Sequence, residues 1–291
     1  MTEKASRFVN SFEIEKQNIS EWIYKLWDEL SEFGPQEIDR SLSHLMQLLC
    51  NLIGADNAFW LGLVRLTADS THTLGRHIGA DYGQLTTPTC DPMNGWRIGA
   101  TERLKKLDIE AQQIRYKAWQ KLEDRAGDTS RAVAARAGHF RAYTLRGGIV
   151  DLEAFKATEH YDFHYRQIGI FDRMWVVFPV SANSESCFLF DRHGEGPSFG
   201  KQEILVAKQA LRGIKWYHRL ALTSHGLGIT QSSLTPKERL VLRFLLTGKS
   251  EKEIAAKLNV THGSIHQYCV NIYKKYNVHG RLELMLLWLL G

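Results

Sequence analysis

A short segment near the carboxyl end, residues 261–276, carries two chemically different faces at helical spacing. One face is an apolar stripe made by Ile265, Tyr268 or Cys269, Ile272 and Tyr276. The other face presents Gly263, His266, Gln267, Val270, Asn271 and Lys274. This second face offers a small residue, hydrogen-bonding groups and a cation, and it contains no carboxylate. A helix that reads base edges in the major groove of DNA needs these properties.

Three other segments contain residues capable of chemistry, and each has a simpler explanation. His160 and His164 could bind a metal from one helix face, but surface or core histidines are the commoner outcome. The segment 194–201 resembles a phosphate-binding loop, yet its spacing is wrong by one and Gln202 stands where Ser or Thr is needed. The stretch 96–146, with twelve Lys or Arg and six acids, is typical of a solvated helical face. Because no catalytic triad or paired-carboxylate spacing is recognisable, we expect no enzyme activity, no cofactor and no metal.

Four helices are predicted after residue 233, and they position the donor-rich face. Two capping boxes, Thr235 with Glu238 and Ser250 with Glu253, mark the starts of the first two helices. A very tight turn at residues 259–260 then leads to Thr261, the expected cap of the third helix. The fourth helix is expected over residues 281–290. A short helix joined by a tight turn to a longer one predicts a helix-turn-helix.

The placement of charge agrees with a polyanion partner. The chain has 291 residues and a net charge of +5. Residues 230–291 contain nine Lys or Arg and four acids, while residues 1–229 contain twenty-eight of each. The whole basic surplus therefore lies in the last fifth of the chain, which suggests a polyanion partner such as nucleic acid; on charge alone, an ordinary solvated surface explains it equally well.

These residues also resemble a known family, the LuxR-type DNA-binding domain. The resemblance covers about sixty residues and rests on ordered landmarks: Leu234-Thr-Pro-Lys-Glu238, Val241-Leu242, Gly248-Lys-Ser250, Glu253-Ile-Ala-Ala-Lys-Leu258, Val260-Thr261, Ser264-Ile265, Ile272 and Lys275. It implies an all-α four-helix domain whose third helix enters the major groove and whose fourth helix often mediates dimerisation. The chain departs from the family pattern at His266, where Lys is usual, and at Tyr268, Tyr276, Asn277 and Gly280.

The resemblance also implies roles for single residues. His266, Gln267, Val270 and Asn271 are expected at base edges. Thr261, Ser264, Lys274 and Lys275 are expected at phosphates. Most of the fourth helix after Glu283 is apolar, so Leu287 and Trp288 are expected to remain exposed and to meet a second copy of the chain. The merely solvated helix face remains the alternative for each of these residues.

The first 221 residues are long enough for a separate core, and residues 222–233 are rich in Gly, Ser and Thr, which predicts a linker before the domain 234–291. We expect helices near residues 19–30 and 38–49, a strand over 54–66 and a largely helical stretch over 100–140. Two strands, 174–179 and 186–191, and one long helix over 200–222 should follow. This order resembles a GAF- or PAS-like sensor, an α+β domain with an antiparallel sheet and helices.

The expected function is a DNA-binding transcription regulator whose activity responds to a small-molecule effector. Double-stranded DNA, a second copy of the chain and RNA polymerase are the candidate partners. Two alternatives remain: a regulator controlled by a protein partner, and an enzyme or scaffold whose C-terminal bundle only mediates interaction. Tyr161, Tyr165 and Asp172 are spaced as in acyl-homoserine-lactone domains, but Arg173 replaces the expected proline, so no lactone is predicted. Scattered cysteines and the absence of an apolar leader or span predict a cytoplasmic, nucleoid-associated protein without a membrane partner.

Overall fold

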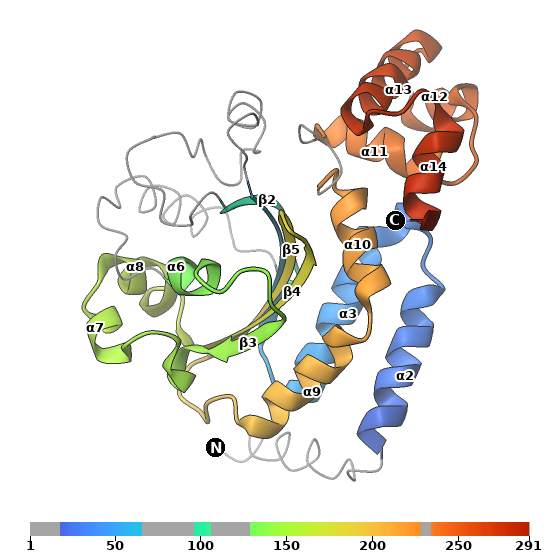
Figure 1. Ribbon diagram of the computed structural model, residues 1–291. Coiled ribbons are helices and arrows are strands. Elements are labelled where there is room, and N and C mark those ends of the chain that lie inside the picture. Colours follow the sequence, from blue (N-terminus) through green and yellow to red (C-terminus); the bar gives the residue numbers. More distant parts are fainter. Residues whose placement is uncertain (1–17, 66–95, 106–128, 228–233, 291) are drawn as a thin grey trace.

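A computed structural model describes residues 18–65, 96–105, 129–227 and 234–290. The chain forms an N-terminal α+β domain, followed by a helical C-terminal domain that lies at the end of α10 (Figure 1). None of the described helices is both long and apolar enough to cross a membrane.

The centre of the first domain is an antiparallel five-stranded sheet with the order β2-β1-β5-β4-β3. Its strands are β1 (Asn57–Arg65), β2 (Trp96–Arg103), β3 (Arg141–Thr144), β4 (Ile170–Ser181) and β5 (Ser184–His193). The expected strand pair is confirmed as the β4–β5 hairpin, which is longer at both ends than predicted. All residues of β5 from Ser184 to Arg192 are buried, so the centre of the sheet is covered on both faces.

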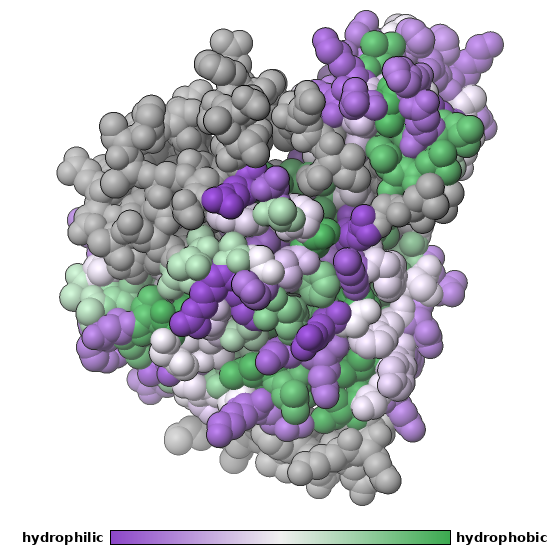
Figure 2. Space-filling model, viewed as in Figure 1, coloured by the Kyte–Doolittle hydropathy of each residue, from purple (hydrophilic) through white to green (hydrophobic). Residues whose placement is uncertain are grey.

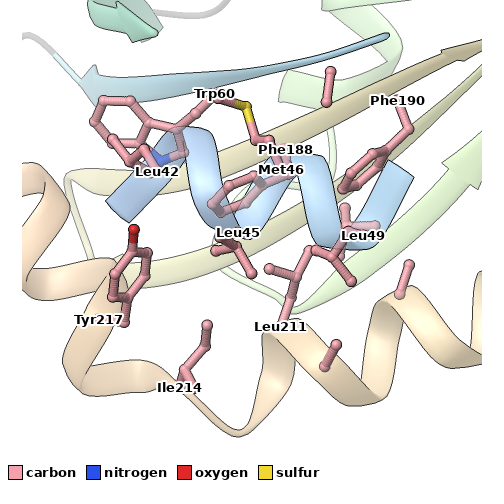
Figure 3. Close-up of a cluster of buried hydrophobic side chains, with 14 of the residues drawn as sticks. Leu42, Leu45, Met46, Leu49, Trp60, Phe188, Phe190, Leu211, Ile214 and Tyr217 are labelled. Carbon is pink, nitrogen blue, oxygen red and sulfur yellow. The ribbon is translucent and has the colours of Figure 1, made fainter. Parts of the chain in front are cut away.

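Helices α2 (Asn18–Ser31), α3 (Ile38–Ile53), α9 (Lys201–Arg212) and α10 (Lys215–Ser224) cover one face of the sheet (Figure 1). Their apolar stripes meet inward-facing strand residues in a large core, where Leu45, Met46 and Leu211 pack with Trp60 and Phe188 (Figure 3). Removing this apolar surface from water is the main force that holds the helical layer on the sheet.

Shorter elements cover the opposite face: α6 (Thr129–Ala134), α7 (Leu152–Lys156), α8 (Glu159–Tyr161) and two π-helical turns, Leu145–Ile149 and Asp162–Arg166. Because side chains alternate along a strand, Phe59 and Trp175 point to this face while their neighbours point to the helical layer. The second core is rich in aromatic rings, including Phe155 and Tyr165.

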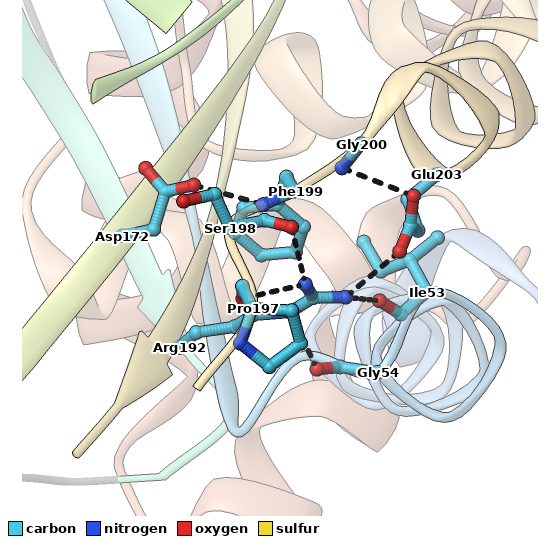
Figure 4. Close-up of polar contacts among 9 residues, drawn as sticks. All are labelled: Ile53, Gly54, Asp172, Arg192, Pro197, Ser198, Phe199, Gly200 and Glu203. Carbon is cyan, nitrogen blue, oxygen red and sulfur yellow. Dashed lines mark hydrogen bonds and ion pairs between the residues drawn. The ribbon is translucent and has the colours of Figure 1, made fainter. Parts of the chain in front are cut away.

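Arg192 joins the helical layer to the sheet (Figure 4). Its guanidinium donates to the carbonyls of Ile53 and Gly54 at the end of α3, to those of Pro197 and Ser198, and to Glu203 of α9. Two loop amides are also used internally: Phe199 N–H donates to Asp172, and Gly200 N–H donates to Glu203. The segment 194–201 therefore wraps an arginine, and carboxylates occupy amides that a phosphate would need.

Three expectations for the first domain need correction. Residues 96–103 form a strand at the sheet edge, because they pair with β1, and residues 106–128 of the expected helical stretch lie outside the described residues. The single long helix is divided into α9 and α10 at Gly213, where the ring of Trp27 leaves no space for a side chain. Residues 222–227 belong to this domain, since Leu222 and Leu227 lie in its core.

The C-terminal domain has the four expected helices: α11 (Pro236–Leu245), α12 (Glu251–Leu258), α13 (His262–Tyr276) and α14 (Arg281–Leu290). Both capping boxes are present. One compact core joins the helices, with Leu242, Ile254, Ile265, Ile272 and Leu284 at its centre.

Candidate functional site

Helix α13 is held by its cap and by its apolar stripe. The hydroxyl of Thr261 accepts a hydrogen bond from the backbone amide of Ser264, which satisfies a free donor in the first turn of the helix. The preceding Asn259 has φ 52°, a left-handed conformation that ends α12 and allows the tight turn. Ile265, Cys269 and others of the stripe are buried, so the opposite face is directed outward.

The outward face of α13 is exposed, as the sequence predicts. His266 is 64% exposed at its side chain, and Val270 and Lys274 are also exposed. The side-chain amide of Gln267 donates a hydrogen bond to the side-chain oxygen of Asn271 over 3.1 Å. This contact presents two adjacent amide groups on one ridge, where each retains a donor and an acceptor that could meet a base edge. Hydrophilic side chains gather over the part of this domain where α12 and α13 lie (Figure 2).

A carboxylate borders this face, which the sequence pattern did not reveal. Glu251, from the first turn of α12, lies 3.2 Å from Nδ1 of His266 and 3.6 Å from Nε2 of His262. The two histidines are four residues apart and therefore share a helix face. The pair of histidines is visible in the sequence, but only the angle between α12 and α13 brings Glu251 close to them.

Lys275 does not lie with the other candidate contacts. Its amine is 2.7 Å from the buried carboxylate of Glu238, and its side chain is only 19% exposed. Glu238 also accepts the amide of Thr235 in the first capping box. A phosphate at Lys275 would have to compete with this pair, so we assign Lys275 to the packing of α13 against α11.

The exposed apolar face of α14 differs from the predicted one. Leu287 is half-buried and packs against the domain core, while the side chain of Trp288 lies outside the described residues. Leu282 and Leu286 are 74% and 39% exposed, and their spacing places them on one side of the helix. The prediction that Leu287 is exposed is thus wrong, because its neighbour Leu286 is the exposed leucine.

A second candidate site is the aromatic face of the first domain's sheet. Arg173 forms a two-point ion pair with Asp191 at 2.6 and 2.8 Å and lies against the rings of Phe59 and Tyr165. Burial disfavours its charge, but the carboxylate of Asp191 more than offsets this and raises the pKa of Arg173. A second buried pair, Arg141 with Glu185, lies on the same face.

The three residues spaced like a lactone site do not come together. Tyr161 and Tyr165 stack at 5.7 Å on the aromatic side, where Arg173 also lies. Asp172 instead accepts hydrogen bonds from the backbone amides of Phe199, Arg146 and Arg173. Burial raises its pKa despite these hydrogen bonds.

Two groups of side chains contain residue types that can bind a metal. His160 and His164 have ring centroids 4.7 Å apart. Among the described residues, Asp39, Glu102 and His225 are the one set of three whose ligand atoms lie within 4.8 Å of one another. Arg243 occupies both carboxylate oxygens of Asp39, at 2.5 and 2.6 Å, so these three residues form part of an ion-pair cluster.

The thiols are also unsuited to chemistry. Cys50, Cys187 and Cys269 are buried and free, and burial raises the pKa of each to about 12. Cys90 lies outside the described residues. Thiols of such high pKa are poor nucleophiles at neutral pH.

Comparison with solved structures finds loose similarities over much of the chain. SdiA in complex with octanoyl-rac-glycerol is 11% identical, with a TM-score of 0.41, over 94% of this chain and 95% of that one. SdiA of Escherichia coli is 14% identical, with a TM-score of 0.43, over 91% and 94%. The LBD domain of VqsR from Pseudomonas aeruginosa is 14% identical, with a TM-score of 0.43, over 69% and 96%. No curated protein matches the sequence at a significant level.

The comparison with protein families is specific to the C-terminal domain. Residues 232–288 match the family described as bacterial regulatory proteins, luxR family. The match spans all of α11, α12 and α13 and most of α14, and it includes the caps and core positions described above. The C-terminal domain of this chain therefore belongs to the luxR family of bacterial regulatory proteins.

Proposed function

We propose that this protein is a transcription regulator that binds double-stranded DNA through the outward face of α13. The observation that carries the proposal is that this face is exposed, rich in hydrogen-bonding groups and held rigidly by a buried stripe on the same helix. The family of the C-terminal domain and its surplus of basic residues support the same conclusion.

Individual roles follow from position on the helix. We assign His266, Gln267, Val270 and Asn271 to base edges, because they occupy the middle of the exposed face. Thr261 and Ser264, at the helix N-terminus, and Lys274, further along, are assigned to phosphates. His266 stands where the family usually has Lys, and its ring can donate or accept a hydrogen bond at a base edge.

Binding by a dimer fits the exposed leucines of α14. Leu282 and Leu286 form an apolar strip on a small domain, and pairing with the same strip of a second copy would remove both from water. The resulting symmetry predicts two half-sites in the DNA. RNA polymerase is the candidate partner on which such a regulator would act.

The first domain is proposed to receive the regulatory signal as a small molecule on the aromatic face of the sheet. Aromatic rings supply an apolar lining there, and the Arg173–Asp191 pair supplies polar groups that could orient a ligand. A protein partner that docks on the same domain is the second candidate. A metabolite panel that raises the melting temperature of the full chain but not of an Arg173→Met variant would favour the small molecule.

The DNA proposal is tested by selecting sequences from a random duplex library with the full chain. We expect a symmetric consensus, and we expect Gln267→Ala to relax preference at one base position in each half-site. Each lost bidentate contact should reduce discrimination by roughly 1–3 kcal/mol. If the selected pool shows no enriched sequence, the chain is not a sequence-specific regulator.

A further inference from the structure

The two domains are joined by a cluster of charged side chains at the meeting point of α3, β2, α10 and α11. Asp39, in the first turn of α3, accepts hydrogen bonds from both terminal nitrogens of Arg243, which lies on α11 of the C-terminal domain. This two-point geometry fixes direction as well as distance, and the Arg243 side chain is only 14% exposed. The contact therefore constrains how one domain sits on the other.

His225 is the third member of this cluster and comes directly after α10. Its ring is buried, and Nδ1 lies 2.7 Å from the carbonyl of Ala221, so Nδ1 must carry a hydrogen. The other nitrogen, Nε2, lies 3.4 Å from Asp39 and 3.4 Å from Glu102 of β2. A lone pair at Nε2 would face two carboxylates, whereas an N–H there attracts both, which favours the doubly protonated ring.

Charges of both signs surround the ring. Asp39 and Glu102 supply negative charge, and Arg239 and Arg243 of α11 supply positive charge. Trp60 of β1 packs against the ring with centroids 4.9 Å apart. Burial disfavours the charge, but the hydrogen bonds that the ring donates to Asp39 and Glu102 outweigh it and raise the pKa of His225.

A second interdomain contact lies beside the cluster. The hydroxyl of Tyr276, the last residue of α13, donates to the carbonyl of Thr223 in α10 over 2.8 Å. The α11 and α13 helices are thus each tied to the first domain by one named contact. Figure 1 shows α11 directly beyond the end of α10.

We propose that Asp39, Glu102, His225 and Arg243 form an interdomain latch, which holds the DNA-binding domain in one orientation and loosens when His225 loses its proton. The latch does not cover the outward face of α13. It acts on the orientation of that helix, which in a dimer sets the spacing of the two recognition helices. This consequence for DNA rests on the proposed function, but the latch itself does not.

The sign of the pH effect follows from the two shifted groups. Burial disfavours ionisation of Asp39, but hydrogen bonds from His225 and Arg243 outweigh this and hold its pKa well below its usual range. Its contribution is therefore present above the usual carboxyl pKa and is lost only in strong acid. The His225 contribution is complete below the ordinary histidine pKa and is lost as pH rises through the raised one. The latch is strongest in mild acid and weaker in base.

The test measures ¹⁵N relaxation of the full chain, because it reports how fast each domain tumbles and needs no DNA. At pH 6 the wild-type domains should share one rotational correlation time. In Asp39→Asn and in Arg243→Gln the value for the C-terminal domain should fall by about twofold or more. The matched controls Asp28→Asn on α2 and Arg219→Gln on α10 change exposed residues outside the cluster and should leave the shared value intact.

Further variants separate the latch from general destabilisation. The double variant Asp39→Asn/Arg243→Gln should tumble like either single variant, because each single substitution already breaks the same ion pair. Raising the pH from 6 to 9 should loosen the wild-type domains and have no such effect in His225→Gln. The proposal fails if Asp39→Asn keeps a single correlation time while folded, or if His225→Gln retains the wild-type pH response. It also fails if a chelator alone releases the domains at pH 6, because a bound metal would then be the link.

Discussion

His218 is a neutral histidine in the middle of the first domain's core. A hydrogen-bond chain defines its state: Trp60 donates to Ser186 Oγ, the hydroxyl of Ser186 donates to His218 Nδ1, and His218 Nε2–H donates to the carbonyl of Leu211. Burial lowers the pKa of this ring to about 4. The ring is also stacked on Phe178, so a proton there would put an uncompensated charge among apolar groups.

Acid should therefore destabilise the protein through His218. Between its ordinary pKa of 6.5 and about 4, the unfolded chain binds a proton at this ring and the folded chain does not. The free energy of unfolding should fall across this window by up to a few kcal/mol relative to His218→Gln. Urea titrations at several pH values measure this, with the exposed His139→Gln as the control. Parallel profiles for wild type and His218→Gln would contradict the assignment.

Two neighbouring lysines on α13 should behave differently. Lys274 is exposed on the outward face, so Lys274→Ala should weaken binding to all DNA sequences and reduce the salt dependence by about one counterion per protomer. Lys275→Ala should leave the buried Glu238 carboxylate without its cation and lower the unfolding free energy by roughly 1–3 kcal/mol. Salt titrations and urea melts of both variants distinguish these effects. An equal change in salt dependence for both lysines would return Lys275 to the DNA surface.

At the scale of elements, Arg192 determines how α3, β5 and α9 meet. Its donors satisfy carbonyls at the end of α3 and in the loop before α9, which have no helical partner of their own. Arg192→Lys should keep the charge but lose most of these directed bonds. We expect the unfolding free energy to drop by roughly 2–4 kcal/mol, with the same far-UV circular dichroism. Arg212→Lys, at an exposed position on α9, serves as control, and equal stability of the two variants would contradict this role.

At the scale of the whole molecule, the proposed dimer would pair through the exposed strip of α14. Leu282→Glu with Leu286→Glu should raise the dimer dissociation constant at least about tenfold, because two charges would replace buried apolar area. Sedimentation equilibrium measures this directly. Leu240→Glu changes a similarly exposed leucine on α11 and should have little effect. A dimer that survives the double substitution must be held by other surfaces.

The helices of the C-terminal domain and their starts could be predicted from the sequence because their signals are local. A cap such as Thr261 acts on amides three residues away, and an apolar stripe recurs every three or four residues. The β4–β5 hairpin was predictable for the same reason, since alternation is also local. The exposed face of α13, and with it most of the candidate contacts, followed from these patterns.

Only the tertiary structure decided what depends on long-range contacts. Trp96–Arg103 is a strand because β1 offers it an edge to pair with, and α9 ends just before Gly213, where the ring of Trp27 packs. Lys275 is drawn away from the proposed DNA-binding face by a glutamate 37 residues earlier, and Arg243 meets Asp39 across 204 residues. Charged side chains carry no mark in sequence of the partner they will find, because ion pairs depend on distances that packing sets. The proposed latch between the domains is therefore a property of the fold, while the outward face of α13 is already evident in the sequence.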